Sequence, residues 1–132
     1  MSHHLRGIRA DALSEPVSHY TDAVLAGRTL YVSGQVAFDA DANVVGVGDV
    51  VEQTRQVFRN MKRVLDSAGA TPADVVKVTV YLLDVADRAR INPVRREFFG
   101  EHRPASTLVQ IGALVHPDLL VEIDAVAVVP ES

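Results

Sequence analysis

The chain has 132 residues, a length typical of one domain that buries its own core. Hydrophobic residues make up 48% and charged residues 23% of the chain, which is the composition of a folded globular domain and excludes a disordered one. The formal net charge is −4, with acidic and basic residues interspersed, which argues against nucleic-acid binding, and the absence of cysteine excludes disulfides, thiolate ligands and a cysteine nucleophile.

The first half of the chain predicts a strand, a loop and a long helix. The stretch GRTLYVSGQVAF, from Gly27, is rich in β-branched and aromatic residues and predicts a strand, and a further strand is expected around SHYTDAV. The segment DADANVVGVGD is typical of a loop. Apolar residues then recur at three- and four-residue steps from Val50 to Ala68, which predicts a helix with Asp49 as its N-cap and Gly69 at its end.

The second half predicts three strands and a short helix. The β-branched run VVKVTVYLLDV, from Val75, predicts a buried strand. Asn92 and Pro93 suit the N-cap and first position of a short helix that ends near Gly100. The segments STLVQIGAL and LLVEIDAVAVV predict two strands on either side of the turn-prone VHPD.

This order of elements predicts an α/β or α+β layer with helices on one face of a sheet. The other, valine-rich face needs cover, which favours self-association with cyclic symmetry. We expect one domain over residues 1–132, with residues 1–18 as a flexible or extended N-terminal segment. No stretch has the length of a membrane span and the start of the chain lacks the apolar core of a signal peptide, so we expect a cytoplasmic protein.

Four segments resemble the Rid family, the reactive intermediate deaminases that are also called the YjgF or L-PSP family. They are GRTLYVSGQV, VFRNMKRVLDSAGATPADVVKVTVYLLDVAD, NPVRREFFGEHRPAST and VEIDAVAV, and the resemblance keeps their order and spacing from about Tyr20 to Val128. It implies a chorismate-mutase-like α+β fold of the bacillus type, with two helices on one face of a mixed sheet. It also implies a homotrimer with a central barrel and clefts between subunits.

The activity that the resemblance implies is the hydrolysis of enamines and imines such as 2-aminoacrylate to a keto acid and ammonia, with no metal or organic cofactor. In the family, an arginine directly after a Pro-Ala pair binds the substrate carboxylate through two charge-assisted hydrogen bonds. Ser106 stands at that position here, and a hydroxyl donates only one neutral hydrogen bond. Standard imino-acid deaminase activity is therefore in doubt, unless Arg103 or, with lower weight, Arg28 replaces the arginine.

Other positions match residues that line the family's cleft, namely Tyr20, Ser33, Gly34 and Asn92, and Thr107 is expected to line the cleft beside Ser106. Asp124 stands where a glutamate commonly holds water or handles protons, and Glu122 lies two residues earlier on the same strand face. We take both carboxylates as catalytic candidates. Leu108 stands where some members carry a cysteine. The histidines show no ligand spacing, so no metal site is expected.

Each of these residues also has a structural interpretation without a ligand. Ser33 and Gly34 can mark a bulge, Asn92 can cap a helix, and Ser106 with Thr107 can satisfy backbone groups at the start of a strand. Glu122 and Asp124 lie in an otherwise apolar strand, which favours a wet cleft or an intersubunit ion pair.

Three functions remain. The leading one is a Rid-type hydrolase acting on an imine, an enamine or a related C–N compound. The missing arginine motivates a second, a metabolite-binding or regulatory trimer without catalysis. Endoribonuclease activity is the least favoured of the three, because the net negative charge of the chain counts against RNA binding.

Overall fold

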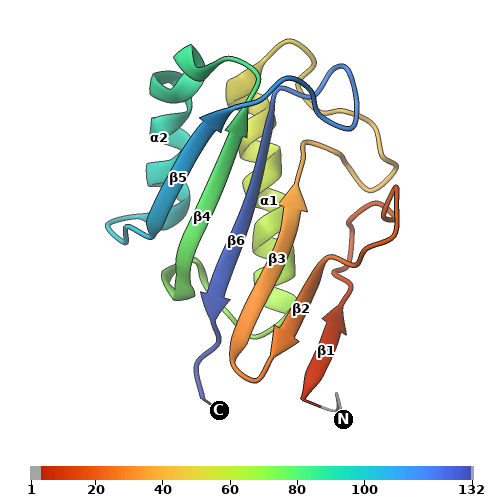
Figure 1. Ribbon diagram of the computed structural model, residues 1–132, viewed down its shortest axis with the longest axis vertical. Coiled ribbons are helices and arrows are strands. Elements are labelled where there is room, and N and C mark those ends of the chain that lie inside the picture. Colours follow the sequence, from red (N-terminus) through yellow and green to blue (C-terminus); the bar gives the residue numbers. More distant parts are fainter. Residues whose placement is uncertain (1–3, 132) are drawn as a thin grey trace.

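The computed structural model describes residues 4–131, so residues 1–3 and 132 of the expected domain lie outside the described part. Within residues 4–131, six strands form one mixed sheet in the order β1-β2-β3-β6-β4-β5, in which only β4 and β5 pair in parallel. The strands are β1 (Leu5–Ile8), β2 (Ala23–Ala26), β3 (Thr29–Gln35), β4 (Val75–Leu82), β5 (Ala105–Gln110) and β6 (Val121–Val128). Helices α1 (Val50–Ser67) and α2 (Arg88–Phe99) both cover one face of this sheet (Figure 1), which confirms the α+β prediction.

Helix α1 begins and ends where its sequence predicts. The Asp49 carboxylate accepts hydrogen bonds from the backbone N–H groups of Val51 and Glu52, which otherwise lack partners at a helix start. Gly69 ends it with a φ of 76°, a conformation that glycine adopts without strain. The apolar stripe of the helix is fully buried against the sheet, since Val57 and Met61 have 0% exposure.

Helix α2 begins earlier than predicted. Asn92 and Pro93 are not its N-cap and first residue, because the helix starts at Arg88 and follows directly on a 3₁₀ turn at Val85–Asp87. Pro93 therefore lies inside the helix, where it has no N–H to donate to the carbonyl of Ala89. Burial of Ile91, which has 0% exposure, explains why the helix extends back past the proline. Its end at Gly100 is as predicted.

The N-terminal part of the chain pairs as strands. β1 lies within the segment expected to be flexible or extended and pairs antiparallel with β2. β2 begins at Ala23, so the strand expected around SHYTDAV overlaps it only in the last two residues of that segment. A second 3₁₀ turn, Pro72–Asp74, joins α1 to β4. Residues 111–120 form one long connection from β5 to β6. β6 does not pair with β5 but lies between β3 and β4.

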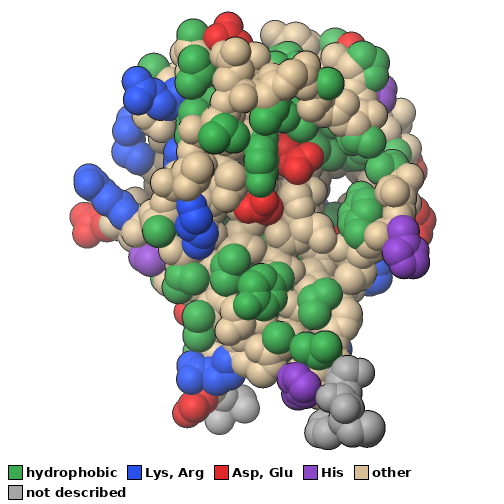
Figure 2. All heavy atoms as spheres, in the orientation of Figure 1, with side chains coloured by type: hydrophobic (Ala, Val, Ile, Leu, Met, Phe, Trp, Pro, Cys, Tyr) green, Lys and Arg blue, Asp and Glu red, His purple; other side chains and the backbone are tan. Residues whose placement is uncertain are grey.

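The sheet face opposite the helices is uncovered. Hydrophobic side chains gather over the lower part of this face, below a pair of acidic groups near its centre (Figure 2). Tyr31 is 53% exposed there, and Val24 and Val128 are 37% and 38% exposed. No helix within residues 4–131 is long and apolar enough to cross a membrane.

Gln53 on α1 connects two loops at one end of the sheet. It has 0% exposure, its side-chain amide N–H group donates to the carbonyls of Gly46 and Asp118, and its carbonyl accepts from the N–H of Leu120. A buried polar side chain with all its groups paired fixes the positions of its partners. Gln53 therefore determines how the loop before α1 meets the connection that leads into β6.

The variant Gln53→Leu keeps the side-chain volume and removes all three hydrogen bonds. We expect a loss of about 2–4 kcal/mol in the free energy of unfolding, because buried backbone groups are left without partners. Urea denaturation measures the loss, with Arg63→Leu at an exposed position of α1 as the control that should change stability by less than about 0.5 kcal/mol. An unchanged midpoint for Gln53→Leu would show that the loops are held by other contacts.

Candidate functional site

The two carboxylates of β6 lie on the uncovered face of the sheet. Ile123 and Ala125 are buried beneath the helices, whereas Glu122 and Asp124 are half-buried on the other side. This follows from the alternation of side chains along a strand. The strand pairs on both sides, with β3 and β4, so both acids lie near the middle of the sheet.

Glu122 lies directly against Gly34 of β3. A β-carbon at Gly34 would be 2.2 Å from Oε2 of Glu122, so any larger residue there would displace this carboxylate from its position. The pairing of β3 with β6 shifts register between Val32 and Gln35, which marks a bulge at Ser33 and Gly34. The Ser33 hydroxyl donates to the carbonyl of Thr21 at 2.6 Å. Ser33 and Gly34 therefore do mark a bulge, and Gly34 also allows close contact with Glu122.

The two acids have different surroundings. Burial raises the pKa of Glu122 above its ordinary value, and the nearby charge of Asp124 raises it further. Asp124 instead accepts a hydrogen bond of 2.9 Å from the hydroxyl of Tyr81, and this bond, with burial, raises the pKa of Tyr81. Glu122 thus keeps its proton to higher pH than an ordinary glutamate, while the hydrogen bond from Tyr81 holds the Asp124 carboxylate in place.

Tyr20 lies near Gly34. It is 48% exposed, and the two residues line a small depression of about 30 Å³ together with Asp22 and Gln35. The structure therefore brings together Tyr20, Ser33, Gly34 and Glu122, which we name the β3–β6 half-site.

Ser106 and Thr107 point to opposite faces at the edge strand β5. Ser106 is paired with Val78, which is buried under the helices, and Thr107 is paired with Thr79 on the open face. The Thr107 hydroxyl accepts from the ammonium group of Lys77 at 2.6 Å. The Ser106 hydroxyl accepts from the guanidinium group of Arg95 on α2, with an Nη2 to Oγ distance of 2.8 Å.

A hollow of about 660 Å³ opens between α2 and the segment before β5. Its lining includes Asn92, Arg95, Arg96 and Arg103, three of which carry positive charge. We name Asn92, Arg95, Arg103 and Ser106 the α2–β5 half-site. Asn92 and Arg103, both predicted from the sequence, thus lie together, and burial lowers the pKa of Arg95.

Arg95 was not among the predicted residues. It lies three positions after Asn92, and residues at this spacing share one face of a helix. The spacing therefore carried a signal for Arg95, although its contact with Ser106 depends on how α2 packs beside β5. Arg28 lies elsewhere, where it donates to the carbonyl of Val129 and pairs with Glu131 at 3.3 Å. Leu108 is half-buried and packs against the core.

One chain does not unite the two half-sites. β3 and β5 are separated by β6 and β4, so three strand spacings put them about 14 Å apart. Ser106 moreover faces the helices, whereas Glu122 faces the open side. Most of the predicted residues therefore fall into two groups on different parts of the molecule, whereas Asp124 and Thr107 belong to neither group.

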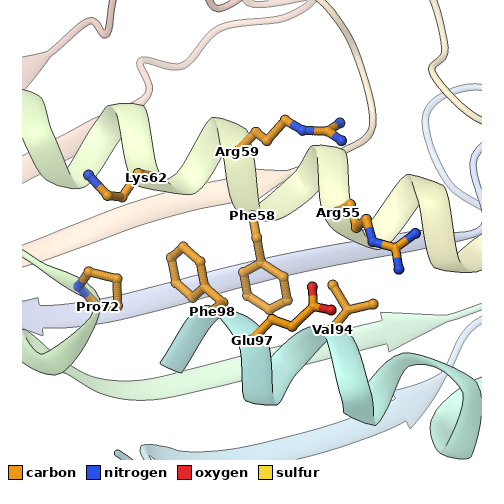
Figure 3. A pocket seen from close by; sticks show the side chains of 8 residues that line it. All are labelled: Arg55, Phe58, Arg59, Lys62, Pro72, Val94, Glu97 and Phe98. Atoms are coloured by element: carbon orange, nitrogen blue, oxygen red, sulfur yellow. The ribbon is translucent and has the colours of Figure 1, made fainter. Parts of the chain in front are cut away.

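Another groove lies between the two helices (Figure 3). Phe58, Phe98 and Val94 form its apolar wall, and its volume is about 440 Å³. None of the predicted site residues lines it. Its cationic side chains are engaged elsewhere, since Arg59 pairs with Glu52 at 3.1 Å. Across residues 4–131, no group of three or more His, Cys, Asp or Glu side chains is arranged to hold a metal ion.

Known proteins resemble the chain along nearly its whole length. Residues 10–129 match the family model described as endoribonuclease L-PSP. A RutC family protein of Pyrococcus horikoshii is 42% identical over 113 residues, 86% of this chain and 89% of the relative. The 3-aminoacrylate deaminase RutC of Acinetobacter baylyi is 44% identical over 112 residues, 85% of this chain and 88% of the relative.

A solved structure shows the same fold. The crystal structure of RidA from an Antarctic Psychrobacter bacterium superposes with a TM-score of 0.88 at 34% identity and covers 94% of this chain and 99% of its own. Sequence and structure thus agree with the resemblance carried by the four segments, and the chain belongs to the Rid family, also known as the YjgF or L-PSP family.

Proposed function

We propose that the protein hydrolyses small enamines and imines of the aminoacrylate type at clefts between the subunits of a homotrimer. One observation carries this proposal: Glu122 lies against Gly34 with a raised pKa, so it can hold a proton beside an open surface. The 3-aminoacrylate deaminase among the relatives supports the class of substrate.

The separation of the half-sites supports a site between subunits. Neither half-site alone offers both a proton donor and a group that binds an anion. The uncovered sheet face provides an apolar surface for association, and a cyclic trimer with head-to-tail contacts sets the β3–β6 half-site of one subunit against the α2–β5 half-site of the next. Three equivalent clefts result, with the sheets packed around a central barrel.

The reaction needs little beyond position and proton transfer. Glu122 donates a proton to the terminal carbon of the enamine, and the C=C electrons form that C–H bond while the nitrogen lone pair forms the C=N bond of an iminium ion. Return of an N–H proton to Glu122 leaves the neutral imine. Water then adds to the imine carbon and gives a carbinolamine. Collapse of the carbinolamine breaks the C–N bond, releases ammonia and leaves a carbonyl, so one enamine and one water give one carbonyl product and one ammonia. In this scheme Asp124, held by Tyr81, orients the water or takes its proton.

Replacing Glu122 with glutamine tests the proton donor. The substrate is 2-aminoacrylate, generated in situ by a dehydratase. After subtraction of the spontaneous rate, we expect the rate of ammonia release to fall about 10²–10⁴-fold. The protonated acid is the active form, so the rate of the unmodified protein should decline as pH rises through the pKa of Glu122, above the range of an ordinary glutamate. Glu122→Gln should lack this decline.

The control is Glu97→Gln, an exposed glutamate on α2 outside both half-sites. It should keep the rate and pH profile of the unmodified protein. If the unmodified protein releases no ammonia from 2-aminoacrylate or 3-aminoacrylate, the hydrolase proposal is wrong. Stabilisation by such compounds without turnover would then favour a metabolite-binding trimer.

Mixed trimers test the intersubunit cleft. Glu122→Gln disables the β3–β6 half-site, and Ser106→Asp disables the α2–β5 half-site by placing a negative charge where an anion would bind. Each variant alone should be inactive. When they are unfolded, mixed in equal amounts and refolded together, each mixed trimer regains one intact cleft in three, and about a quarter of all sites become active.

Recovery of activity requires that the two residues act across a subunit boundary. No recovery from a mixture whose trimeric mass is verified by light scattering would contradict the intersubunit cleft. A monomeric mass for the unmodified protein would contradict the assembly itself.

A further inference from the structure

Ser106, which stands where the resemblance implies an arginine, is in contact with an arginine from another element. Arg95 reaches from α2 to the edge of the sheet and donates to the hydroxyl of Ser106 at 2.8 Å. Its side chain is half-buried, unlike the neighbouring Arg96, which is exposed. A guanidinium group in a partly desolvated position binds an anion more strongly than one in water.

Arg95 has no acidic partner within the described part of the chain. Several other arginines pair with a carboxylate, such as Arg59 with Glu52 at 3.1 Å and Arg90 with Asp87 at 3.1 Å. For Arg95 no carboxylate of residues 4–131 lies within 4.0 Å, and its one hydrogen bond goes to a neutral hydroxyl. A guanidinium group has five N–H donors, so most of its donors remain for a ligand.

The surroundings of Arg95 favour an anion. The hollow that it lines, about 660 Å³ in volume, is also lined by Arg96 and Arg103. Glu101 is the one carboxylate in this lining, and it is exposed. The amide of Asn92 adds a neutral donor one helical turn from Arg95. The charge and the donors of this hollow thus suit a small, planar carboxylate.

We propose that Arg95, oriented by Ser106, is the carboxylate-binding group of this site. The group that binds the carboxylate is then on helix α2, whereas the resemblance places it at position 106 on strand β5. Ser106 orients the Arg95 side chain. This inference rests on the proposed function and makes it more specific, since the substrates are then imines or enamines that carry a carboxylate. A second consequence is that Ser106→Arg, which places another cation beside Arg95, does not strengthen binding.

Binding of pyruvate, which has the carboxylate and carbonyl of a keto-acid product, tests the assignment in the assembled protein. Methyl pyruvate is the matched probe without the charge. Calorimetry or ligand-observed NMR should show that the unmodified protein prefers pyruvate, and Arg95→Gln should raise the Kd of pyruvate at least about tenfold. The Kd of methyl pyruvate should not change, which separates a lost anchor from a disturbed fold.

Three further variants complete the test. Arg95→Lys should recover part of the pyruvate affinity because it keeps the charge but not the planar fork. Ser106→Ala should raise the Kd of pyruvate by a smaller factor than Arg95→Gln does. Arg63→Gln removes the same charge from an exposed position of α1 outside the hollow and should leave both Kd values unchanged.

The inference is overturned if Arg95→Gln keeps the pyruvate affinity of the unmodified protein, or if pyruvate and methyl pyruvate bind the unmodified protein equally. These outcomes do not depend on turnover. Arg95-dependent binding of pyruvate without ammonia release would contradict the hydrolase and support the anchor. If the protein releases ammonia and the Arg95→Gln variant has the same KM as the unmodified protein, the hydrolase proposal is supported and the role of Arg95 as the carboxylate-binding group is contradicted.

Discussion

The position of β6 between β3 and β4 is the constraint on which the other features depend. It pairs antiparallel with both neighbours. Val128 pairs with Thr29 of β3, and Val121 pairs with Leu82 of β4. One face of the strand closes the core under the two helices, and the other carries Glu122 and Asp124. Because both edges of β6 are paired, these carboxylates cannot move away from the middle of the sheet.

This placement links the chemistry of the protein to its assembly. The acid that lies against Gly34 and the cation that lies beside Ser106 are on different parts of one molecule. In the proposed trimer the same apolar face that drives association also brings these groups together. Burying a carboxylate next to such a face costs free energy, which is consistent with the raised pKa of Glu122.

The elements with local signals were predictable from the sequence. The boundaries of α1 follow from its apolar stripe and from Asp49, and β3 follows from its β-branched residues. Pro93 misled the prediction of α2 because its local preference was outweighed by burial of Ile91 elsewhere in the fold. The contact of Arg95 with Ser106 and that of Glu122 with Gly34 depend on strand register and helix packing. Spacing along the chain does not specify these contacts, so the sequence named most of the candidate residues but neither their grouping nor Arg95.

The order in which the strands are made also matters for how the protein folds. β3 and β6 are about ninety residues apart in sequence, so the contacts between them are long-range. Until the ribosome has released β6, the inner edges of β3 and β4 have no partner and the helices cover an incomplete sheet. Such unpaired edges are sites of aggregation. Until β6, the last strand of the sheet along residues 4–131, has been made, these edges of β3 and β4 are therefore open to wrong pairing.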